Sequence, residues 1–158
     1  MRPNIKLDKS LKVKLDARIL NAADYFILAL ADQLAGLFPT AVVYTCAQQQ
    51  GAKLPACFIS IYHATAQGAL GGAFALEFET EVTYITADAL ARDEQLSAAV
   101  AMLEMPAELP SDIGVFVLKG RGVSNNDGMV QLLCRTEAVL KSPNTDDLMQ
   151  NLEQGVNV

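Results

Sequence analysis

The chain has 158 residues, of which 51% are hydrophobic and 19% are charged, so its composition is that of a globular domain and not of a disordered chain. Its net charge of −6 argues against general binding of nucleic acid, because such binding depends on Lys and Arg side chains that neutralise phosphates. Three widely spaced cysteines without a Cys-x-x-Cys pair exclude the disulfide framework of a small secreted protein: Cys46, Cys57 and Cys134.

Residues 1–16 form a basic segment in which apolar residues alternate with Lys12 and Lys14. This alternation is typical of an edge strand or an extended arm, and a loosely held terminus is the alternative. The segment lacks the apolar run of a signal peptide, and no stretch of the sequence is long and apolar enough to span a bilayer. We therefore expect a basic N-terminal arm on a protein that is made in the cytoplasm and contacts no membrane.

Two segments carry apolar residues at the three- and four-residue spacing of an amphipathic helix. The first helix is predicted over residues 17–38, where Gly36 and Pro39 mark its end. The second helix begins after a capping residue, Thr86 or Asp88, and is ended by the prolines that follow it. Its predicted buried stripe consists of Leu90, Leu96, Ala99, Val100 and Leu103.

Five segments are predicted strands, and the longest, residues 70–85, is the centre of the expected sheet. Its side chains alternate, so that one face is apolar and three glutamates lie on the other: Glu77, Glu79 and Glu81. The other predicted strands are residues 41–46, 55–65, 113–123 and 129–140, and the last two flank an Asn-Asn-Asp-Gly turn that is typical of a hairpin.

The order of these elements predicts an α+β fold in one domain over residues 17–141. We expect a mostly antiparallel sheet of about five strands with two helices packed on one face. Residues 142–158 are polar and acidic and are expected to form a C-terminal tail.

No catalytic, metal or cofactor site is predicted. His63 is the only histidine, and its neighbours do not supply the partners of a nucleophilic relay, so we expect a half-buried strand residue. The cysteines lack the short-spaced pairs of a structural zinc site and are expected to pack in the core. The glycines near residues 71–72 and 120–122 match neither a phosphate-binding loop nor a dinucleotide fingerprint.

The three glutamates of the central strand leave more than one interpretation open. Carboxylates two residues apart on a strand lie roughly 7 Å from each other, within the loose range of acid–base pairs. No tryptophan accompanies them as a sugar-binding platform. A solvated strand face is one alternative to a catalytic pair, and a charged surface matched to Lys and Arg of a neighbouring subunit is the other.

Four segments resemble, in order, the tail terminator proteins of long-tailed phages and phage-like contractile particles, which are also called tail completion or neck proteins. The most specific match is a Gln/Gly turn followed by Pro-x-Cys-Phe-x-Ile. The similarity covers roughly residues 17–141, and the segments that carry it are ALADQLAGLFP, QQQGAKLPACFISI, LGGAFALEFETEVTYI and NNDGMVQLLCRTEAVL.

The resemblance implies a small structural protein of the particle tail that is not an enzyme, needs no cofactor and is assembled in the bacterial cytoplasm. It implies a ring, usually hexameric, that caps the tail tube, ends its polymerisation and meets the sheath or the neck connector. Its partners would be further copies of itself, the tail tube protein and the sheath or connector protein, without sequence-specific binding of nucleic acid.

Ring contacts are head-to-tail, so one patch of the chain must complement a different patch. The candidate interface residues are Glu77, Glu79 and Glu81 on the acidic strand face, and Lys12, Lys14 and Arg121 as basic partners. We expect charge reversal at Glu79 and Glu81 to weaken the ring and to leave the protomer folded.

Two other functions fit the sequence. One is another tail or neck component, such as a head–tail joining or tube-like subunit, and unlimited filaments would distinguish a tube subunit from a ring. The other is a small ligand-binding domain or enzyme that uses the glycine-rich residues 68–72, for which substitution of Glu77 and His63 would abolish an activity without affecting assembly.

Overall fold

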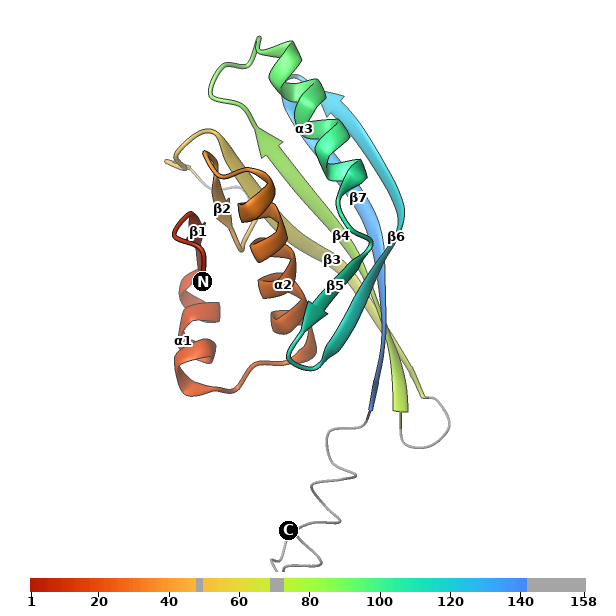
Figure 1. The fold of residues 1–158 in the computed structure, drawn as a ribbon. Helices are drawn as coiled ribbons and strands as arrows, with labels where there is room; N and C mark the ends of the chain where they lie inside the picture. The colour runs from red at the N-terminus through yellow and green to blue at the C-terminus, as the bar shows by residue number, and fades with distance from the viewer. Residues whose placement is uncertain (48–49, 69–72, 142–158) are drawn as a thin grey trace, which may run out of the picture.

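In the computed structural model, which describes residues 1–47, 50–68 and 73–141, one seven-stranded sheet has the order β1-β2-β3-β4-β7-β6-β5 (Figure 1). The strands are β1 (Ile5–Lys6), β2 (Val42–Tyr44), β3 (Ala56–Gly68), β4 (Ala73–Ile85), β5 (Glu108–Ser111), β6 (Gly114–Asn126) and β7 (Met129–Lys141). The helices are α1 (Lys9–Ala17), α2 (Ala22–Leu37) and α3 (Arg92–Glu104). The expected C-terminal tail, residues 142–158, lies outside the described residues.

The predicted fold class is wrong, because the sheet is mixed and has seven strands, and three helices accompany it within the described residues. The pairs β1–β2 and β2–β3 are parallel, and the other neighbouring strands are antiparallel. The two strands that were not predicted are short. β1 spans two residues, too few for any periodicity, and β5 contains Pro110, which an edge strand tolerates because it need not donate to a neighbour on both sides.

The N-terminal region contains the short edge strand β1 and the helix α1, so the alternation at Lys12 and Lys14, which is typical of a strand, lies in a helix. Asp8 begins α1 by accepting a hydrogen bond from the Leu11 amide, and Arg18 ends it in the left-handed conformation at φ 58°. A reciprocal capping box of Asn21 and Asp24 then begins α2. The single helix predicted over residues 17–38 therefore starts five residues later, at Ala22.

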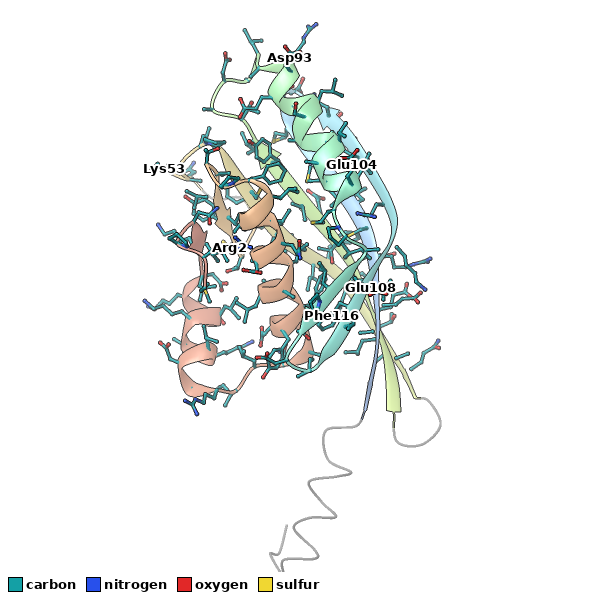
Figure 2. The ribbon with its side chains drawn as sticks, in the orientation of Figure 1. Arg2, Lys53, Asp93, Glu104, Glu108 and Phe116 are labelled. Atoms are coloured by element: carbon teal, nitrogen blue, oxygen red, sulfur yellow. The ribbon has the colours of Figure 1, made fainter. Side chains whose placement is uncertain are left out.

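The alternation predicted for the central strand is confirmed over the described side chains of β4. Phe78, Val82 and Tyr84 are buried beneath the helices, and the three glutamates point to the other face. The core centres on Phe26 of α2, whose ring centroid lies 5.5 Å from that of Phe78 and 5.3 Å from that of Phe116 on β6 (Figure 2). Burial of each such ring contributes roughly 1.5–3 kcal/mol.

The predicted hairpin between the last two long strands is confirmed. Asp127 and Gly128 have φ angles of 52° and 83°, which is the conformation of a two-residue type I′ turn. This turn fixes the register of β6 against β7, so that Asn126 pairs with Met129. The long strands β3, β4, β7 and β6 thereby form the middle of the sheet, with both long helices on one face (Figure 1).

Candidate subunit interface

The face of β3, β4, β7 and β6 that points away from the helices is covered by no helix within the described part of the chain (Figure 1). We call this surface the open face. Strand register aligns its side chains in cross-strand rows. One row runs His63, Glu79, Arg135 and Lys119, and the next runs Thr65, Glu77, Glu137 and Val117.

The charges of the open face are largely paired with one another. Arg135 lies 3.7 Å from Glu77 through its Nε and the Oε1 of that carboxylate, and Lys119 forms an ion pair with Glu137. The hydrogen bond from Lys119 holds the pKa of Glu137 below its ordinary value. Exposed pairs of this kind contribute little to stability, so they shape the surface more than they stabilise the fold.

Glu81 is held by neutral donors instead of a cation. The Thr83 hydroxyl and the Gln131 side-chain amide donate to its Oε1 over 3.1 and 3.2 Å. These contacts hold the carboxylate between Thr83 of its own strand and Gln131 of β7. The acidic row predicted from the sequence therefore exists, and its first and third members already have partners within the same protomer.

Two large apolar side chains stand among these charges. Tyr62 on β3 is 56% exposed and Leu133 on β7 is 45% exposed. Tyr62 borders two shallow hollows, one lined also by Glu79, Leu133 and Arg135, and the other by Glu81 and its neighbours. An exposed aromatic and an exposed aliphatic side chain surrounded by charge have the composition of an interface centre with a polar rim.

The three basic residues predicted to complement the glutamates lie elsewhere in the protomer. Lys12 is exposed on α1, on the helix-covered side, and Lys14 of the same helix forms an ion pair of 3.4 Å with Asp24. Arg121 points toward α3, where its guanidinium donates to the carbonyls of Met102 and Met105. The protomer does not bring these three cations to the glutamate row.

A glycine bulge explains the position of Arg121. The register of β6 shifts between Lys119 and Gly122, and Gly120 adopts φ 58° there. The extra residue turns the Arg121 side chain to the covered face, where it satisfies carbonyls that the last turn of α3 leaves free. Arg121 is thus a helix cap in this protomer.

His63, the cysteines and the glycine-rich segment were the residues considered for other chemistry. His63 is exposed opposite Glu79, and no group of three His, Cys, Asp or Glu side chains is arranged to hold a metal ion in the described segments. Burial raises the pKa of the Cys57 thiol, and it raises that of Cys134 to about 11, so neither is a ready nucleophile. Of the glycine-rich segment, residues 69–72 lie outside the described part.

Sequence reasoning missed the apolar pair and the cations of the open face, namely Tyr62, Leu133, Arg135 and Lys119. The signal for two of them, Leu133 and Arg135, was the alternation of residues 129–138, in which Gln131, Leu133, Arg135 and Glu137 share one face. The position of Tyr62 depends on an irregularity of β3 between Ile61 and His63, which no sequence pattern announces.

Comparison with known proteins adds no family. No protein-family model matches the chain, and no curated protein sequence matches it. Within the described residues, no helix is both long and apolar enough to cross a bilayer.

Proposed function

We propose that this protein is a non-enzymatic structural subunit of a phage tail or a phage-like particle, and that copies of it form a ring that caps the tail tube. The resemblance of four segments to tail terminator proteins supports this function. The structural observation that carries it is the open face, which spans the middle of the sheet and exposes Tyr62 and Leu133 within a frame of charged side chains.

A surface of this kind fits a protein partner better than a small ligand. Its hollows are shallow and its charges are spread over four strands, whereas ligand sites are concave and enclose their ligand. The two apolar side chains serve as anchors, and the surrounding ion pairs give the contact its specificity. We assign the open face to the contact with the tail tube or with the sheath or neck connector. The protein would assemble in the bacterial cytoplasm.

The test is a tube-growth assay in which purified full-length protein is added to tail tube protein as it polymerises. We expect short tubes with one ring at an end. Leu133→Asp should abolish capping, because a carboxylate replaces an anchor at the centre of the contact. Leu54→Asp is the matched control, since Leu54 is 42% exposed, close to the 45% of Leu133, but lies in the loop before β3.

Charge reversal at Glu79 and Glu81 probes the rim of the same surface. The double substitution Glu79→Lys, Glu81→Lys should weaken capping and leave the protein folded, with a thermal unfolding temperature lowered by a few degrees because Glu81 loses its bonds to Thr83 and Gln131. Tubes that grow to unlimited length in the presence of the wild-type chain would overturn the proposed function. Filaments of the purified chain alone would indicate a tube-like subunit instead.

A further inference from the structure

The outer side of α3 is an apolar stripe that the sequence assigns to the core and the structure places at the surface. Leu96, Val100 and Leu103 follow the i, i+4, i+7 spacing of one helix side and are 66%, 43% and 43% exposed. Leu90, just before the helix, is 82% exposed. The predicted buried stripe is therefore wrong for these four residues.

Polar contacts on the inner side fix this orientation of α3. Gln95 is 3% exposed, and its side chain donates to the Ala89 carbonyl over 3.0 Å and accepts from the Asn125 amide over 2.9 Å. Arg121 holds the other end of the helix by its bonds to the last carbonyls. Rotating α3 to bury the leucines would break these contacts and leave buried polar groups unpaired, which costs about 1–3 kcal/mol for each group.

Two further exposed apolar side chains lie at α1, and we call them the α1 patch. Val13 on α1 is 59% exposed, and Ile19, just after the end of that helix, is 66% exposed. α1 follows β1 at one edge of the sheet, whereas α3 packs over β6 and β7 toward the other edge, with α2 between them (Figure 1). The chain thus has two different apolar patches on two different sides.

The charges around the two patches are opposite. Residues 6–18 contain five basic and two acidic side chains, whereas residues 88–104 contain one basic and four acidic side chains. Asp93 and Glu104 mark the two ends of α3 at the surface (Figure 2). A second copy of the chain therefore offers both an apolar surface and a charge complementary to each patch.

We propose that α1 of one protomer docks on the outer side of α3 of the next, with Val13 and Ile19 against Leu96, Val100 and Leu103. The contact is head-to-tail, so an open assembly keeps one free patch of each kind at its two ends until it closes into a ring. The inference rests on the proposed function for the closure of that ring, whereas the contact itself can be measured on the purified chain alone. It leaves the open face free for a different protein.

The test uses two double variants that preserve charge and helix formation. Val13→Gln, Ile19→Gln removes the α1 patch, and Leu96→Gln, Val100→Gln removes the α3 patch. Sedimentation should show that the wild type self-associates and that this association weakens at high salt. The association constant of each variant alone should be lower by a factor of about ten or more. All substituted side chains are exposed, and circular dichroism checks that both variants stay folded.

Mixing the two variants distinguishes this contact from any other. The intact α3 of the first variant can bind the intact α1 of the second, so an equimolar mixture should form a dimer that neither variant forms alone. Leu133→Gln is the matched control, since Leu133 is 45% exposed on the open face, and it should assemble like the wild type.

Three results would overturn the contact: a monomeric wild type at high concentration and low salt, variants that assemble like the wild type, or a mixture that stays monomeric. Failure of the proposed function has a different signature. Variants that assemble normally and still cap tubes refute the contact alone, and a wild type that assembles through this contact without capping tubes refutes the function alone.

Discussion

Thr80 lies at the centre of β4 with its hydroxyl buried and unpaired. The side chain is 0% exposed on the core face, opposite Cys134 of β7, and its Oγ1 finds no hydrogen-bond partner among the described residues. Burying a hydroxyl without a partner costs about 1–3 kcal/mol in mutational data. Valine has nearly the same shape and replaces the hydroxyl by a methyl group. We therefore expect Thr80→Val to stabilise the protein by about 1–2 kcal/mol.

For a chain of this length, each kcal/mol shifts the thermal midpoint by roughly 2–4 °C, so the variant should unfold about 2–8 °C higher. Thr83→Val is the control on the opposite face of the same strand. The Thr83 hydroxyl donates to Glu81 over 3.1 Å, so its loss should cost about 0.5–1.5 kcal/mol. Urea and thermal unfolding followed by circular dichroism measure both changes. A Thr80→Val protein that is less stable than the wild type would refute the reasoning, because it would mean that the hydroxyl has a partner such as a bound water.

Three further predictions concern a turn, a carboxylate and a thiol. Gly128→Ala should destabilise the protein by about 2 kcal/mol in urea unfolding, because the φ angle of Gly128 is +83° and the added Cβ would lie 2.9 Å from the Ala89 carbonyl oxygen. An unchanged midpoint of urea unfolding would contradict this prediction. Glu137 should titrate by NMR below its ordinary pKa because Lys119 donates to its carboxylate. The stability from this bond is present above the pKa of the unfolded chain and is lost as pH falls through the pKa of the folded protein. Lys119→Met should raise the pKa of Glu137 toward its ordinary value, and an unchanged pKa would contradict this cause. Cys57 should resist a thiol reagent at pH 8 in the native protein and react once guanidinium unfolds it, because burial raises the pKa of its thiol. Fast labelling of Cys57 in the native protein would contradict this prediction.

Local sequence signals predicted the long elements at the middle of the sheet. The alternation in β4 identifies its buried face, and Asp127 with Gly128 supplies the residues that a type I′ turn requires. The parallel pairing of β1 and β2 could not be predicted in the same way. It depends on two helices that return the chain across the sheet, and no local pattern in a two-residue strand records its neighbour.

Periodicity alone suggested the wrong type of element for α1 and the wrong buried side for α3. In α1, lysines and apolar residues alternate as in a strand, and the deciding signal is the Asp8 cap at its start. In α3, adjacent sides are both apolar, so the larger leucines suggest the core, whereas the hydrogen bonds of Gln95 turn Ala98 and Met102 inward.

The candidate interface could also be predicted only in part. The shared face of Glu77, Glu79 and Glu81 follows from the two-residue period of a strand. Their companions Arg135 and Lys119 arrive through strand register, which the hairpin turn and the glycine bulge set together. A bulge shifts every later side chain of its strand relative to the neighbouring strand, so the residue spacing could not predict which face of the sheet carries Arg121.

The most direct measurement of the central claim is the mass of the purified chain by light scattering at two salt concentrations, with negative-stain images of the same fractions. We predict one closed ring, with a mass near six times the 16.9 kDa of the protomer, that loosens as salt rises. A monomer that persists at every concentration and salt, or filaments of indefinite length, would contradict it.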